Sequence, residues 1–347
     1  MARAVVTQNN SETEGESQDK GRDRRHRILE LLLVVLLAFG IPILHSVYAL
    51  LRNPGVSHTP CRLLRVVISL IFLGYVLCRK RRTDPNAVPV GNPQDKGAVV
   101  PFARVARLIG CIRQVRLFEW WLVVLVAFWR PVVALAYRWL GQVDYAGGLS
   151  GMLVGNVRDV PGVLDKAVGL CVLGYVLHRR GSAFSDLGLR WSGVGAALAL
   201  PLFLLGRLLS TVQWPFFYWL GQTFGGPDWH PPDIEAMIFG SGDISIAMPL
   251  DSLLNGFFEE VIVRAFVMTE VIKLTQRTWL AVVVSVSLQT SYHFYQGVPV
   301  ALSHVALFTL FALFYAKTRS ILPVALAHSL NNLSADWGYG LRRMLPY

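Results

Sequence analysis

Long apolar runs recur along this chain of 347 residues and constrain its fold more than any other feature. Most of these runs are long enough for a helix to cross a bilayer, in which every backbone polar group must be satisfied internally. Hydrophobic residues make up 53% of the chain and charged residues only 16%. The sequence therefore predicts an all-α, polytopic transmembrane bundle with about eight to nine spans. The runs are 28–51, 63–78, 118–140, 161–178, 193–212, 252–273, 279–296, 299–316 and 321–336.

The net charge of +11 reflects basic residues clustered at the ends of apolar runs, as in Arg79-Lys80-Arg81-Arg82. This distribution is typical of the cytoplasmic ends of membrane helices. Aromatic residues are not interleaved with these basic clusters, so a nucleic-acid partner is not expected. We expect an integral membrane protein of a prokaryotic inner membrane.

The chain divides into three predicted parts. Residues 1–27 form a polar and basic tail of disordered character. Residues 28–160 form N-terminal membrane helices, interrupted by a polar connection at about 79–103 that carries turn signals. Residues 161–340 form a second membrane domain, which holds the polar residues that indicate a functional site.

Two adjacent acids lie inside the apolar run 252–273, with a basic residue close behind them. Glu259 and Glu260 precede Arg264 in this run. Charged residues at membrane depth are costly and indicate a functional site. On a helix, Glu260 and Arg264 share one face and can pair. This pairing leaves Glu259 available for chemistry.

Three further polar side chains lie within later apolar runs. His293 follows the glutamates in the next run, and His328 and Asn332 lie four residues apart in the last one. A carboxylate beside an imidazole can activate water by general base catalysis. A second imidazole and an amide can stabilise an oxyanion. These groups suffice for peptide-bond hydrolysis without a covalent intermediate.

The order and spacing of these residues resemble the CPBP family, which comprises CAAX proteases and bacteriocin-processing enzymes and is also called Abi. The similarity covers roughly residues 250–335. It implies an intramembrane endopeptidase in which Glu259 and His293 activate water, and His328 and Asn332 hold the oxyanion. Glu260 and Arg264 would support this geometry.

Two positions affect how this resemblance is applied. The family usually has Phe four residues before its intramembrane His, whereas this chain has Gln289. Asn331 adjoins Asn332, so a shift in helix register would exchange their roles.

Zinc is the alternative to a metal-free reaction. Glu259, His293 and His328 are acceptable zinc ligands, and three protein ligands plus water form the usual catalytic arrangement. No histidine is followed by Glu, so the HExxH motif is absent. We favour the metal-free reaction, with no cofactor.

The expected partners are membrane lipid and a peptide or protein substrate near the membrane. Prenylated CAAX proteins, bacteriocin precursors and proteins with C-terminal sorting signals are the substrate options that the resemblance implies. The alternative function is non-catalytic, in bacteriocin self-immunity or protein sorting. A proton-coupled transporter is a third possibility, but no inverted repeat of broken helices is evident.

Overall fold

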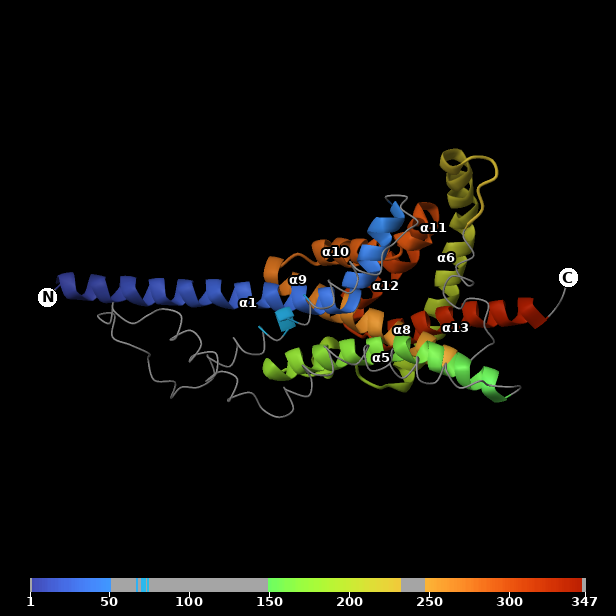
Figure 1. Cartoon of the computed structure of the whole chain (residues 1–347). Coiled ribbons are helices and arrows are strands. Elements are labelled where there is room, and N and C mark those ends of the chain that lie inside the picture. The colour runs from blue at the N-terminus through green and yellow to red at the C-terminus, as the bar shows by residue number, and fades with distance from the viewer. Residues whose placement is uncertain are drawn as a thin grey trace, which may run out of the picture. The chain divides into compact units, whose positions relative to one another are not determined.

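The computed structural model describes residues 2–50, 149–231 and 247–344, with isolated positions at 67, 70–72 and 74. In these residues the protein contains helices and no strands, which confirms the predicted all-helical fold class. The predicted spans 63–78 and 118–140, and the connection 79–103, lie largely or wholly outside the described residues. Figure 1 labels the α-helices, which are α1 (Ala2–Leu50), α5 (Leu149–Arg179), α6 (Gly193–Gly225), α8 (Ala247–Glu259), α9 (Met268–Thr275), α10 (Thr278–Ser291), α11 (Val298–Ser303), α12 (Val305–Thr318) and α13 (Leu322–Met344). Three shorter helical segments lie between them, η1 (Phe184–Leu187), η2 (Glu260–Val267) and η3 (Phe294–Gln296).

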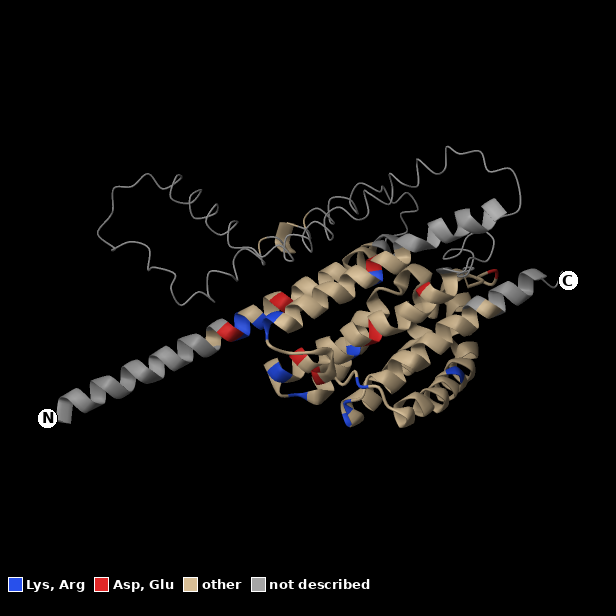
Figure 2. Ribbon diagram, turned by 90° about the horizontal axis from the view of Figure 1, so that it is seen from below, with Lys and Arg blue, Asp and Glu red and all other residues tan. Residues whose placement is uncertain are grey.

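The described helices follow the apolar runs closely in the C-terminal part. Three segments among the described residues are long and apolar enough to cross a membrane, at Asp23–Leu44, Gly193–Gly225 and Val298–Thr318. The predicted number of eight to nine spans is therefore not confirmed. Charged residues are sparse on the described helices, as Figure 2 shows. The exposed face of α6 is instead rich in large apolar side chains, including Leu200, Leu204, Leu208 and Phe216, which suits contact with lipid.

The disordered character predicted for the N-terminal tail stays a prediction. In the structure, helix α1 begins at Ala2 and therefore contains residues 2–27. The division of the chain at residues 27, 160 and 340 stays a prediction. Contacts instead group residues 1–56 and 144–347 into one unit and residues 57–143 into a second.

Within the first unit, α8 packs between α5 and α13, and α13 also packs against α6 (Figure 1). Ion pairs connect α5 to α8, and the residue after α5 to α1 and α9. Lys166 of α5 bonds Asp251 of α8 at 2.6 Å. Arg180, just after α5, pairs with Glu30 of α1 and lies 2.9 Å from Glu270 of α9.

The predicted run 252–273 is not one regular α-helix. Its centre, η2, is a π-helix of eight residues, all of them buried, between α8 and α9. Backbone bonding from residue i to i+5 widens such a turn, and π-helical turns are frequent at functional sites. The α-helical spacing predicted from the sequence is therefore wrong for the residues after Glu259, although Glu260 and Arg264 still pair.

Candidate active site

Glu259 ends α8 and is held by three neutral side chains. Its Oε1 accepts a hydrogen bond from Asn255 Nδ2 at 2.9 Å. Its Oε2 accepts from Tyr292 Oη at 2.7 Å and from Gln289 Nε2 at 3.0 Å. The side chain is almost fully buried. Among the described residues no cation forms an ion pair with this carboxylate, so its charge remains available to act on a neighbouring group.

Tyr292 is itself fixed by the N-terminal helix. Its ring stacks on Phe39 of α1, with centroids 4.5 Å apart and an interplanar angle of 5°. Phe39 also contacts the ring of Phe258, the residue before the acidic pair. Helix α1 therefore packs directly against the residues that hold Glu259 in place.

Glu260 begins η2, is fully buried, and bonds a different set of partners. Its Oε1 lies 2.7 Å from His328 Nδ1, so the Nδ1–H of His328 donates to this carboxylate. Its Oε2 lies 3.3 Å from Nε of Arg264, a buried ion pair. The guanidinium of Arg264 also donates to the Phe308 carbonyl at 3.3 Å and lies over the Phe308 ring.

Gln289 links the two acids. Its Nε2 donates to Glu259 Oε2 at 3.0 Å and to Glu260 Oε1 at 3.3 Å, and its side chain is fully buried. The sequence marks this position only as a departure from the family pattern. In the structure, the polar residue that replaces the usual Phe holds both carboxylates in one arrangement.

His293 lies in the turn between α10 and η3, so the predicted continuous span 279–296 is interrupted here. Its Nδ1 lies 2.7 Å from the Gln289 carbonyl oxygen. Since a carbonyl can only accept, Nδ1 carries the proton, and Nε2 is the acceptor nitrogen of the neutral ring. A bound water can therefore donate a hydrogen bond to Nε2 of His293.

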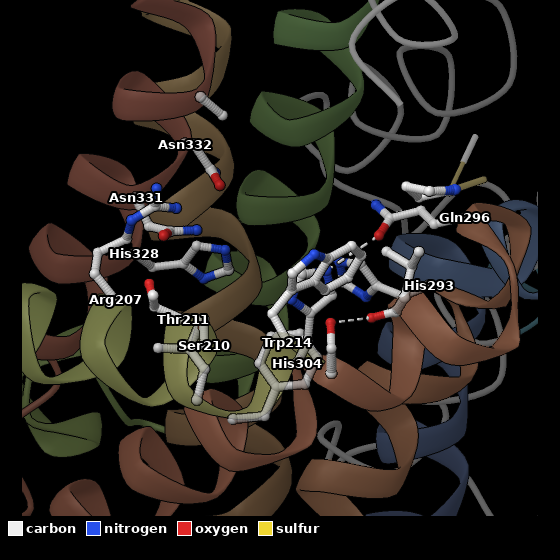
Figure 3. A pocket seen from close by; sticks show the side chains of 16 residues that line it. Arg207, Ser210, Thr211, Trp214, His293, Gln296, His304, His328, Asn331 and Asn332 are labelled. Atoms are coloured by element: carbon white, nitrogen blue, oxygen red, sulfur yellow. Dashed lines mark hydrogen bonds between the residues drawn. The ribbon is translucent and has the colours of Figure 1, made fainter. Parts of the chain in front are cut away.

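A cavity of about 600 Å³ brings together residues from α6, the turn before η3, α11, α12 and α13. His293, His328 and Asn332 all line it (Figure 3). In this view His328 lies on the opposite side from His293. Asn332 Nδ2 makes a long hydrogen bond of 3.4 Å to the Ser252 carbonyl, and Asn331 also lines the cavity. Both amides of the Asn331-Asn332 pair are therefore at the site.

Within the described residues, neither imidazole is a hydrogen-bond partner of Glu259. His328 bonds the second glutamate instead. Glu259 is linked to His293 through Gln289, whose side chain bonds Glu259 and whose backbone oxygen bonds His293. Direct contacts and Gln289 thus connect five of the six predicted residues into one polar group, namely Glu259, Glu260, Arg264, His293 and His328. Asn332 bonds Ser252 instead and shares only the cavity lining with His293 and His328.

Comparison with family models gives one match. Residues 242–334 match the family of type II CAAX prenyl endopeptidases described as Rce1-like. The match confirms the CPBP resemblance, and it spans every residue of the connected polar group. No curated protein and no solved structure matches the chain.

The close approach of α8 and α13 positions the two motif-bearing helices of the Rce1-like segment. Gly256, one turn before the glutamates, faces Ser329, the residue after His328. A Cβ added at Gly256 would lie 2.8 Å from the Cα of Ser329. Ser329 Oγ also donates to the Leu253 carbonyl at 2.8 Å. Small residues allow membrane helices to approach in this way.

Gly256→Ala is therefore expected to separate α8 from α13, lowering stability by about 1–3 kcal/mol and disturbing the Glu260–His328 contact. Thermal unfolding of the purified protein measures the first effect. Gly193→Ala is the matched control, because a Cβ there meets nothing within 4 Å. An unfolding midpoint for Gly256→Ala equal to that of the control would contradict the close packing.

The zinc alternative predicted from the sequence can be compared with the geometry of the described side chains. No group of three or more His, Cys, Asp or Glu residues in the described part of the chain is arranged to hold a metal ion. The alternative zinc set Glu259, His293 and His328 stays a prediction.

Several residues of the site are not predicted from the sequence. His304 lines the cavity and bonds Gln296 through Nε2 at 3.2 Å (Figure 3). In the sequence it is an isolated histidine in an apolar run. Asn255 and Tyr292 hold Glu259 but belong to no charged motif. The i, i+4 spacing of Asn255 and Glu259 is the only sequence signal for any of these contacts.

Proposed function

We propose that the protein is an intramembrane endopeptidase that cleaves a membrane-associated peptide with water activated by Glu259 and His293. One observation carries this proposal. The buried acidic pair is joined by Gln289 and His328 to a cavity that His293, His328 and Asn332 line. The Rce1-like match supports a protease in general. The glutamate-dependent mechanism is our inference from the residues.

The reaction begins with water bound in the cavity at Nε2 of His293. Nε2 of His293 orients the water, and the carboxylate of Glu259 accepts one proton from it as the water oxygen attacks the scissile carbonyl carbon. A C–O bond forms and the carbonyl π-electrons move to its oxygen. The C–N bond then breaks, and the same proton is delivered to the leaving amine.

His328 and Asn332 stabilise the oxyanion that forms on the carbonyl oxygen. With Nδ1–H directed at Glu260, a protonated His328 ring presents Nε2–H as a donor. The amide of Asn332 supplies a second donor. Fixed donors of this kind stabilise charge that develops in the transition state, and the ion pair of Glu260 with Arg264 keeps His328 oriented.

The substrate class that best fits the family match is a prenylated C-terminal CAAX peptide, in which the modified Cys anchors the chain at the membrane. Such a substrate requires a prenylating enzyme as an upstream partner. Sorting signals and bacteriocin precursors fit the same membrane location but lack the prenyl group.

The test uses the full-length protein in lipid vesicles with a farnesylated peptide ending in Cys-a-a-X. Mass spectrometry should detect release of the terminal tripeptide, with little release from the same peptide without its farnesyl group. A zinc chelator should leave the rate unchanged. Absence of cleavage in wild-type vesicles that bind the peptide would refute the proposed activity, and chelator inhibition reversed by zinc would refute the metal-free mechanism.

A further inference from the structure

Arg207 places a positive charge near the middle of α6, a candidate membrane-spanning helix. Arg207 is itself exposed, as are its apolar neighbours Leu204, Leu205 and Leu208. A charge at membrane depth faces a protein interior or an aqueous cavity, and often marks a substrate path. Arg207 lines the same cavity as the proposed catalytic residues.

The side chains that α6 presents to the cavity follow helical periodicity. Arg207, Ser210, Thr211 and Trp214 are spaced i, i+3, i+4 and i+7, and all four line the cavity. This spacing selects a single face of a helix. Figure 3 shows Arg207 near His328 and Asn331, on the side of the cavity away from His293.

No carboxylate in the described part of the chain pairs with Arg207. None of the described residues that line the cavity is Asp or Glu. The groups nearest in sequence on the same face are the neutral hydroxyls of Ser210 and Thr211, which can also donate hydrogen bonds. The cavity therefore offers a cation and several neutral donors, and the complementary ligand carries a negative charge.

We propose that Arg207 binds the C-terminal carboxylate of the peptide substrate. This inference rests on the proposed function, since it places the scissile bond and the C-terminus of one bound peptide at different residues of the same cavity. The scissile carbonyl lies at His328 and Asn332, and the terminal carboxylate lies at Arg207. A guanidinium suits this role because it binds a carboxylate through two parallel hydrogen bonds.

Arg207 lies outside the segment matched to the Rce1-like family, which begins at residue 242. The carboxylate subsite is thus supplied by a helix that the family match does not cover. Substrate selection and bond cleavage are thereby divided between α6 and the motif-bearing helices.

The test separates binding from cleavage. Vesicles containing the full-length protein are titrated with a farnesylated peptide whose scissile bond is reduced and cannot be hydrolysed. Two forms are compared, one with a free C-terminal carboxylate and one with a C-terminal amide. The proteins compared are the wild type, Arg207→Gln, Arg207→Lys and the control Arg277→Gln, which removes an exposed charge outside the cavity lining.

The wild type and Arg277→Gln should bind the free acid roughly 10- to 100-fold more tightly than the amide, because a hydrogen bond to a charged group is lost in the amide. Arg207→Gln should bind both forms about equally, and Arg207→Lys should keep part of the preference. Equal binding of both forms by the wild type would overturn the proposal. A preference that survives in Arg207→Gln would also overturn it.

The same titration separates the carboxylate subsite from a lipid contact and from the protease function. If Arg207→Gln weakens both forms equally and leaves the ratio unchanged, Arg207 contacts lipid headgroups or supports the fold, and the carboxylate subsite is wrong. If the wild type prefers the acid but does not cleave the hydrolysable peptide, the subsite is supported and the proposed protease function fails.

Discussion

Glu259→Gln is expected to lower kcat/KM for peptide cleavage by roughly a hundred- to ten-thousandfold, the range that a general base contributes. Glutamine has nearly the same shape and keeps an oxygen that accepts a hydrogen bond from Tyr292 or Gln289. The substitution removes the negative charge that accepts the proton of water. Peptide cleavage in vesicles, followed by mass spectrometry, measures the change.

The fold should survive this substitution, so the unfolding midpoint of Glu259→Gln should stay close to that of the wild type. Asp186→Asn is a matched control, because it neutralises an exposed acid and keeps an acceptor for the Ala183 N–H. It should cleave at the wild-type rate. Undiminished cleavage by Glu259→Gln would contradict the assignment of the base.

Arg264→Met is expected to destabilise the protein by about 3–5 kcal/mol, because it leaves the charge of Glu260 buried without its cation. Both side chains are fully buried and their charged atoms lie 3.3 Å apart. The substitution also removes the hydrogen bond to the Phe308 carbonyl. The unfolding midpoint of the purified protein in detergent should fall accordingly.

The double variant Glu260→Gln with Arg264→Met provides the comparison for this prediction. Removing both charges eliminates the uncompensated one, so the double variant should unfold at a higher temperature than Arg264→Met alone. It should still be a poor enzyme, since His328 loses its charged partner. A double variant less stable than the single one would contradict the ion-pair argument.

The sequence predicts the C-terminal helices well because an apolar run in a bilayer must satisfy its own backbone hydrogen bonds, which favours a helix. The run 299–316 corresponds to α11 and α12, which together form one candidate span at Val298–Thr318. The π-helical turn from Glu260 to Val267 is not predictable in this way. Nothing in the local pattern distinguishes it from an α-helix, because packing against neighbouring helices determines the wider turn.

The charged residues of the site can be predicted from the sequence, whereas the uncharged residues that hold them cannot. Glu259 and Glu260 are conspicuous because charge is rare at membrane depth. Gln289 and Tyr292 carry no charge, so only the tertiary contacts reveal that they hold Glu259. The pairing of His328 with Glu260 rather than Glu259 also depends on how α13 crosses η2.

A double-mutant cycle of Glu259→Gln and His293→Gln tests most directly whether this acid and this imidazole act on the same water. Single-turnover cleavage rates are measured for the wild type, both single variants and the double variant. Residues that act as a unit give strongly non-additive losses. We predict that the double variant is about as slow as the slower single variant. Losses that multiply, so that the double variant is slower by the product of the two single effects, would contradict the shared action of Glu259 and His293.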